Sequence, residues 1–186
     1  MKKILSLSLV AAFVLLGLSC KKKEEADKLT QFDINYSTNL AIPAASITVT
    51  TPTTSVEFTT PNVPTQQATK FSAEGTSQSL ISEITMTKFT VSAVNSGTTT
   101  SNLDYLKSLT IYIKAVGVGE EIVATKSNIP TGSTSVSMDV TGTNIKNYIF
   151  KDNIQFRVLA IFDASAVNDQ TLKLDETVHV KATLIK

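Results

Sequence analysis

Several residue types are scarce in this chain of 186 residues: it has no tryptophan, one cysteine, one histidine and seven glycines. The single cysteine, Cys20, excludes an internal disulfide and any cluster of thiolate metal ligands. The chain also has no glycine-rich phosphate loop and no basic patch interleaved with aromatic residues. We therefore expect no cofactor and no bound metal.

The chain also lacks an excess of positive or negative charge. The chain has 17 basic and 16 acidic residues, and without its first nineteen residues, which include Lys2 and Lys3, the balance is 15 to 16. Such a neutral body gives no electrostatic reason to bind nucleic acid. With 42% hydrophobic residues, the chain is long enough for one core and short for two, which predicts a single domain.

The first twenty residues have the pattern of an export signal. Lys2 and Lys3 precede residues 4–18, an apolar run interrupted only by two serines. A membrane-spanning helix needs about 20 apolar residues, so this run is short for a span and typical of a signal-peptide core. Small Ser19 and then Cys20 end the run, and a charged stretch begins at once.

Residues 15–20, Leu-Leu-Gly-Leu-Ser-Cys, resemble the lipobox of bacterial lipoproteins. The resemblance implies that residues 1–19 are removed and that Cys20 becomes the N-terminus, attached to the lipid bilayer by acyl chains such as palmitate. Lys23, Glu24 and Glu25 resemble the surface-export signal of Bacteroidetes lipoproteins, which implies the outer membrane with the protein facing the cell exterior. Residues 20–30 would then be a lipidated, charged tether. Two plainer interpretations stay open: Cys20 as a small apolar residue beside a secretory cleavage site, and the charged run as a solvated spacer.

Alternation of apolar and polar residues dominates residues 31–186. In the clearest example, Leu109, Ile111 and Ile113 alternate with Thr110 and Tyr112. Similar segments lie at residues 32–36, 47–49, 56–58, 84–93, 122–124, 136–140, 154–162 and 178–184. Roughly seven to nine strands at ~8–12 residue spacing predict an all-β fold, an antiparallel two-sheet β-sandwich of Ig-like or Greek-key type with one or two short helices.

Several local features are expected. The alternation of apolar and polar residues shifts by one position around Thr87 and Lys88, which predicts a β-bulge. Residues 65–79 are predicted to form a long connection that ends in a helical turn at 77–81. A second helical turn is expected at 102–107, and chain turns are expected at 117–120 and 130–133. Thr143 is expected to cap a short helix at 145–149. The strand at 154–162 is apolar on both faces near Leu159 and Ile161, so it should be the central, most buried strand.

The candidate chemical groups are few. His179 lies on the polar face of its strand, and no G-x-S-x-G turn supplies a nucleophile for it. Asp163, Asn168 and Asp169 could supply oxygen ligands for a calcium ion. The glycine-punctuated spacing of a calcium loop is missing, however, which favours a polar hairpin loop.

Carboxylate pairs and an outward aromatic residue are the remaining candidates. Glu120 with Glu121 and Asp175 with Glu176 are adjacent pairs whose side chains diverge on a strand. Tyr112 is the best candidate for a sugar-stacking platform, although an ordinary cross-strand aromatic residue is the favoured interpretation.

The sequence therefore predicts a non-enzymatic, membrane-anchored surface lipoprotein that acts as a binding module through its loops or outward faces. Its partner would be an envelope protein or an extracellular ligand. A structural envelope component that docks on other lipoproteins through a sheet edge is the alternative, and a carboxylate-dependent hydrolase is the weakest hypothesis.

Overall fold

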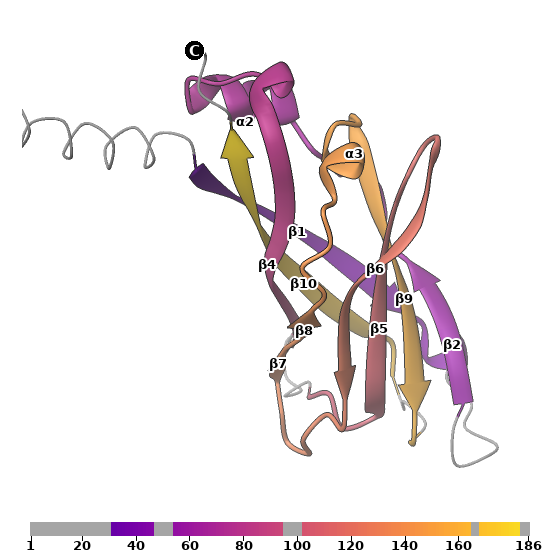
Figure 1. Ribbon diagram of the computed structural model, residues 1–186. Coiled ribbons are helices and arrows are strands. Elements are labelled where there is room, and N and C mark those ends of the chain that lie inside the picture. The colour runs from indigo at the N-terminus through magenta and orange to yellow at the C-terminus, as the bar shows by residue number, and fades with distance from the viewer. Residues whose placement is uncertain (1–30, 47–53, 95–101, 165–167, 183–186) are drawn as a thin grey trace, which may run out of the picture.

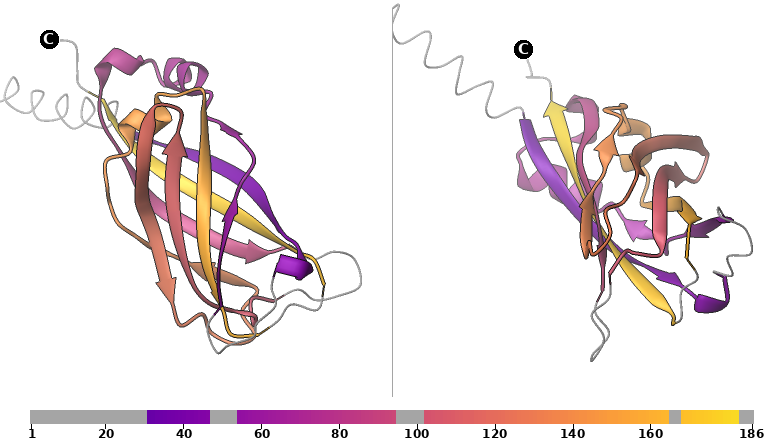
Figure 2. Two further views of the ribbon diagram at one scale, coloured as in Figure 1. Left: turned by 90° about the vertical axis from the view of Figure 1, so that its right-hand side faces the viewer. Right: turned by 90° about the horizontal axis from the view of Figure 1, so that it is seen from below.

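Two antiparallel β-sheets packed face to face form the protein, as Figures 1 and 2 show. The structure is a computed structural model that describes residues 31–46, 54–94, 102–164 and 168–182. The predicted all-β two-sheet sandwich is therefore confirmed. In the left view of Figure 2, the strands of one sheet run obliquely to those of the other.

Sheet I contains four strands in the order β1-β10-β4-β7. Their bounds are Gln31–Ile42 for β1, Gln170–Ala182 for β10, Ile81–Ala93 for β4 and Ser135–Ser137 for β7. In β1 every second residue from Ile34 onward is turned inward, because apolar side chains alternate with polar ones along that strand. The hydrophobic pattern thus fixes which face of the sheet meets the core.

Sheet II contains the order β2-β9-β5-β6-β8, with β3 also paired to β9. The bounds are Thr54–Thr59 for β2, Val63–Pro64 for β3, Leu106–Ala115 for β5, Val118–Ser127 for β6, Asp139–Val140 for β8 and Asn153–Phe162 for β9. Strand β9 has partners on both sides, as its apolar composition predicted. Residues 154, 156, 158, 160 and 162 of this strand are all buried.

The core lies between the sheets and is joined by aromatic contacts. The rings of Phe89 on β4 and Phe156 on β9 meet edge to face with their centroids 5.5 Å apart. Both side chains are fully buried. An edge-to-face pair adds to the stabilisation that comes from area burial, so this contact ties sheet I to sheet II.

The segment expected to be one strand at 136–140 is divided between the two sheets. Residues Ser135–Ser137 pair with β4 in sheet I, whereas Asp139–Val140 pair with β6 in sheet II. Met138 lies between them, buried, and its N–H donates to the carbonyl of Phe89 at 2.9 Å. Val136 and Met138 both bury their side chains where the chain crosses between the sheets.

The predicted β-bulge is present. Thr177 pairs with Lys88 and Val178 pairs with Met86, so Thr87 is the extra residue of β4. The bulge lets Met86 and Phe89 both enter the core although they are separated by three positions.

The helical segments agree with the sequence only in part. The 3-10 turn Gln78–Leu80 is where a helical turn was expected, but the connection before it contains a helix, α2, at Gln67–Ala73 that the pattern did not predict. The single turn expected within residues 102–107 is present, since the N–H of Leu106 donates to the carbonyl of Leu103 at 2.9 Å, and β5 begins directly at Leu106. A further 3-10 turn spans Ala44–Ser46.

The cap of α3 also differs from the prediction. This helix spans Lys146–Ile149, and Thr143 provides no side-chain cap. Asn144 acts instead, since its Oδ1 accepts hydrogen bonds from the backbone N–H groups of Lys146 at 3.1 Å and Ile84 at 3.2 Å. The side chain thereby also ties α3 to β4.

The two ends of the sandwich carry different elements. The start of β1, the end of β10, helices α2 and α3 and the turn between β5 and β6 lie at one end (Figure 1). That turn consists of Val116 and Gly117, one residue earlier than expected. The turn predicted at 130–133 is present and lies at the opposite end (Figure 1). Within the described residues, no helix has the length and apolar character needed to cross a bilayer.

Candidate functional site

The residues expected from the sequence to carry a lipid and a sorting signal lie outside the described part of the chain. These are Cys20, Lys23, Glu24 and Glu25. The first described residue, Gln31, begins β1. The start of β1 lies at the end of the sandwich that carries α2 and α3 (Figure 1).

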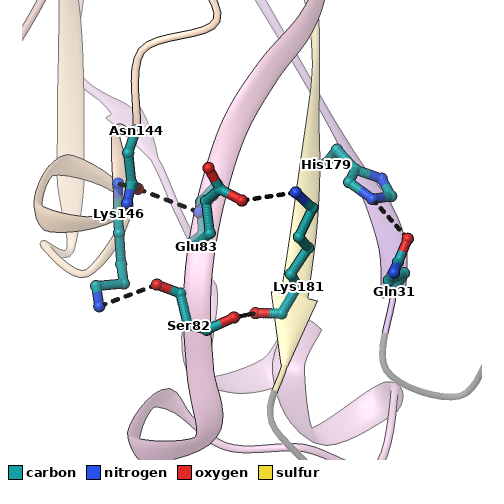
Figure 3. Close-up of polar contacts among 8 residues, drawn as sticks. Gln31, Ser82, Glu83, Asn144, Lys146, His179 and Lys181 are labelled. Carbon is teal, nitrogen blue, oxygen red and sulfur yellow. Dashed lines mark hydrogen bonds and ion pairs between the residues drawn. The ribbon is translucent and has the colours of Figure 1, made fainter. Parts of the chain in front are cut away.

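His179 lies on the outward face of sheet I, where its parity predicts. Its Nδ1 is 2.8 Å from Asp33 Oδ1 and its Nε2 is 3.2 Å from Gln31 Oε1, so both ring nitrogens contact β1. Figure 3 shows the contact between His179 and Gln31 beside the neighbouring ion pair, in which Lys181 Nζ is 2.7 Å from Glu83 Oε2. The histidine is engaged in a cross-strand network rather than poised beside a nucleophile.

The three residues weighed as calcium ligands lie in the connection between β9 and β10, where the sequence favours a polar loop. Asp169 Oδ1 accepts a hydrogen bond from the N–H of Ala44 at 2.8 Å and so holds the start of the 3-10 turn after β1. No group of three histidine, cysteine, aspartate or glutamate side chains suited to a metal occurs in the described ranges. The residues around Asp163 and Asn168 belong to the connection between β9 and β10.

The adjacent carboxylates diverge as their strand geometry predicts. Asp175 points outward to Lys173, with Nζ and Oδ1 2.9 Å apart, whereas Glu176 points into the core and is 2% exposed. Partial burial opposes ionisation of Asp175, but hydrogen bonds from Lys173 and Ser37 outweigh it and lower its pKa.

The outer face of sheet I is polar throughout its three long strands. Outward residues of β1, β10 and β4 carry hydroxyl, amide or charged groups, with Ala41 the exception. A hollow of about 420 Å³ lies beside the bulge and is lined by Asn35, Tyr36, Ser37, Lys88, Thr90, Asp175, Glu176 and Thr177. Its side chains bind one another, as in the hydrogen bond from Thr177 Oγ1 to Asn35 Oδ1 at 2.8 Å. This face is typical of a solvated surface.

The outer face of sheet II is different, because apolar and aromatic groups gather there. We define the sheet II patch as Tyr112, Ile122, Arg157, Leu159 and Ile161. Tyr112 on β5 pairs with Arg157 on β9 and Ile122 on β6, so these three side chains share one face. Leu159 and Ile161 follow Arg157 on the same face of β9 and are half-buried, while Ile122 is 38% exposed.

Arg157 holds the centre of the patch. Its guanidinium carbon lies 3.8 Å from the centroid of the Tyr112 ring, and its nitrogens pair with Glu57 at 2.8 Å and Glu120 at 2.7 Å. Hydrogen bonding to Glu120 raises the pKa of Arg157, and the same bond lowers the pKa of Glu120. One face of the tyrosine ring is thus covered, which argues against a free sugar-stacking platform.

Sequence reasoning found Tyr112 but missed the rest of the patch. Leu159 and Ile161 were expected to be deeply buried, and they are only half-buried because no layer covers the outer face of sheet II in the described structure. Ile122 was expected at the start of a short strand, but a register shift beside it gives it an outward position. The sequence signal for the outward apolar residues of β9 was that residues 154–162 are apolar on both faces of the strand.

Sequence reasoning also missed a buried acid. Glu176 faces the core between Leu174 and Val178, opposite Tyr36 on β1 and Phe89 on β4. Neither carboxylate oxygen has a hydrogen-bond partner among the described residues.

A lysine and a tyrosine lie near this acid. Lys70 on α2 places its Nζ 3.6 Å from the Tyr36 ring centroid and donates to the carbonyl of Asn35 at 3.2 Å. The tyrosine hydroxyl donates to the carbonyl of Thr65 at 3.1 Å. Lys70 therefore also covers part of the free edge of β1, which disfavours strand addition at that point.

Comparison of the chain with models of protein families gives no match, and comparison with curated proteins gives none either. Any functional assignment therefore depends on the geometry of the molecule itself.

Proposed function

We propose that this protein is a non-enzymatic interaction module, anchored to the outer membrane through lipid on Cys20, that binds a protein partner with the sheet II patch. The observation that carries the proposal is the contrast between the two outer faces. The outer face of sheet I presents hydroxyls, amides and paired charges, whereas the outer face of sheet II places Tyr112, Ile122, Leu159 and Ile161 among its polar residues, on the same face as Arg157.

The composition of the patch favours a protein partner. Tyrosine and arginine are the residue types that most often dominate binding energy at protein interfaces, and the surrounding aliphatic groups exclude water. Arg157 is fixed by two glutamates before any partner arrives. Such a preorganised side chain loses little conformational freedom on binding.

The same ion pairs argue for binding rather than carboxylate catalysis. Glu57 and Glu120 are the acids that converge on one point of this face, and both are held by Arg157. A general acid needs a raised pKa, whereas the pKa of Glu120 is lowered.

Photo-crosslinking on intact cells tests the proposal. A photoreactive side chain at Thr125, exposed on the outer face of sheet II, should give an adduct of fixed mass, and Ile122→Lys should reduce its yield. The same side chain at Asn39, exposed on the outer face of sheet I, is the matched control and should give no such adduct. Equal adducts from both positions, or no effect of Ile122→Lys, would contradict a role for the patch.

Two further measurements test the anchor and its location. Mass spectrometry of the mature protein should find acyl chains on Cys20, and an unmodified thiol there would contradict the anchor. Protease added to intact cells should degrade the domain, and full protection of an expressed chain would exclude display on the cell exterior.

A further inference from the structure

The turn between β5 and β6 carries the most exposed large apolar side chain in the described residues. Val116 is 90% exposed, and the only other exposed large apolar side chain there is Ile122 at 38%. Val116 forms the apex of a tight turn with Gly117, whose φ of +73° is a conformation that glycine adopts freely. Apexes of tight hairpins normally carry Asn, Asp, Ser or Gly, which favour both the turn and the solvent. A valine at this point satisfies neither preference.

The position of the turn indicates what the valine meets. The turn lies at the end of the sandwich where β1 begins and β10 ends, opposite to the turn at residues 130–133 (Figure 1). Ten residues separate Cys20 from Gln31, and a chain of that length spans at most about 35 Å. A lipid on Cys20 would therefore hold the start of β1, and with it this end of the domain, within about 35 Å of the bilayer.

We propose that the β5–β6 hairpin rests on the bilayer and inserts Val116 at the lipid interface, which fixes the orientation of the anchored domain. This inference rests on the proposed lipid anchor. One valine is too small to recruit a soluble protein to a membrane, but a tethered domain meets the surface at a high effective concentration, so a small contact is enough to select one orientation.

The charges beside the apex indicate which lipids matter. Lys114 precedes the turn, and the acidic residues Glu120 and Glu121 follow it, so the hairpin has no excess of positive charge. Val118 and Ala115 flank the turn and pack against the core, which gives the apex a firm base. The contact is therefore apolar and does not depend on anionic lipid or on salt.

Paramagnetic broadening by spin-labelled lipid tests the inference. The described residues begin at Gln31, so a chain that starts at Cys20 retains all of them, and its only thiol can be coupled to a maleimide lipid in zwitterionic nanodiscs. The amide signals of Gly117 and Gly119 should broaden, whereas that of Gly132, at the opposite end, should not. Val116→Asp should abolish the broadening at Gly117 and Gly119, and it should leave the other amide positions in place because the side chain is exposed.

Two results would overturn the inference: broadening at Gly132 equal to that at Gly117, or broadening at Gly117 that Val116→Asp does not change. Chemical coupling makes this test independent of natural acylation. An unmodified Cys20 in cells would remove the anchor but leave the nanodisc result, whereas a negative nanodisc result beside an acylated Cys20 would remove only the hairpin contact.

Discussion

Glu176 makes the stability of this protein depend on pH in a range where exposed glutamates do not titrate. The side chain is 2% exposed, and its neighbours with charge or a titratable group are Tyr36 on β1, Lys70 on α2 and Asp175 on its own strand. Burial, with a smaller contribution from Asp175, raises the pKa of Glu176 to about 8, while Lys70 opposes the shift. The acid is therefore protonated in the folded protein at neutral pH.

The sign of the effect depends on which state holds the proton. In the unfolded chain Glu176 has the ordinary glutamate pKa of 4.5, so below that value both states hold the proton. Between pH 4.5 and about 8 only the folded state holds it, and each pH unit lowers the free energy of unfolding by about 1.4 kcal/mol. The stabilisation is fully present at acid pH and is lost by about pH 8, a total of about 5 kcal/mol.

Urea unfolding at pH 5, 6, 7 and 8, followed by circular dichroism, measures this effect. Glu176→Gln keeps the shape of the side chain and removes its titration, so the variant should lose the slope and exceed the wild type most at pH 8. The single histidine is present in both chains, so its contribution cancels in the comparison.

Glu74→Gln is the matched control, because Glu74 is exposed at the end of α2, and this variant should keep the wild-type slope. Parallel stability curves for the wild type and Glu176→Gln from pH 5 to 8 would refute the reasoning.

Three further predictions concern the fold. Phe156→Ala removes a fully buried ring and should lower the free energy of unfolding by about 3–5 kcal/mol, whereas Val116→Ala at the exposed apex should change it by less than about 0.5 kcal/mol. Equal urea midpoints for the two would contradict the core assignment. Asn144→Ala should cost about 1–2 kcal/mol because two backbone donors lose their acceptor, and Asn144→Asp should restore most of it. Deletion of Thr87 removes only the extra residue, so Met86 and Phe89 stay on the inward face of a regular strand and the other residues of β4 keep their partners on β10; the variant should therefore still unfold cooperatively in urea, and loss of cooperative unfolding would show that the bulge itself is required.

The strands and the bulge were predictable because they depend on local alternation. In β5 Leu109, Ile111 and Ile113 are buried and the residues between them are not, which is the pattern that the sequence shows. The shift at Thr87 was visible for the same reason, since a change of phase in the apolar residues requires an extra residue in the strand.

Other features depend on contacts that a local pattern does not encode. Helix α2 buries only Phe71, so it has no apolar stripe at helical spacing. The division of residues 135–140 between two sheets depends on partners more than ten residues away in the chain.

The candidate site was only partly predictable. The sequence of β9, which is apolar on both faces, is compatible with a second face covered by another layer and with one open to solvent. The outward, half-buried position of Leu159 and Ile161 could therefore be seen only in the structure. The inward position of Glu176 did have a signal, because it shares the parity of Leu174 and Val178.

The two proposals together constrain the kind of partner. Tyr112 lies on β5, four residues before Val116 at the apex of the turn. At about 3.3 Å per residue, Tyr112 and its cross-strand neighbours are about 13 Å from that apex. If the hairpin rests on the bilayer, a protein that covers the sheet II patch must occupy the layer directly above the lipid headgroups. A partner that is itself held at the membrane pays no further cost to reach that layer, whereas a freely diffusing one loses orientations to the membrane surface. We therefore expect the adduct formed from Thr125 to contain an envelope protein that stays with the membrane when cells are washed, and an adduct removed by washing would separate the patch from the hairpin contact.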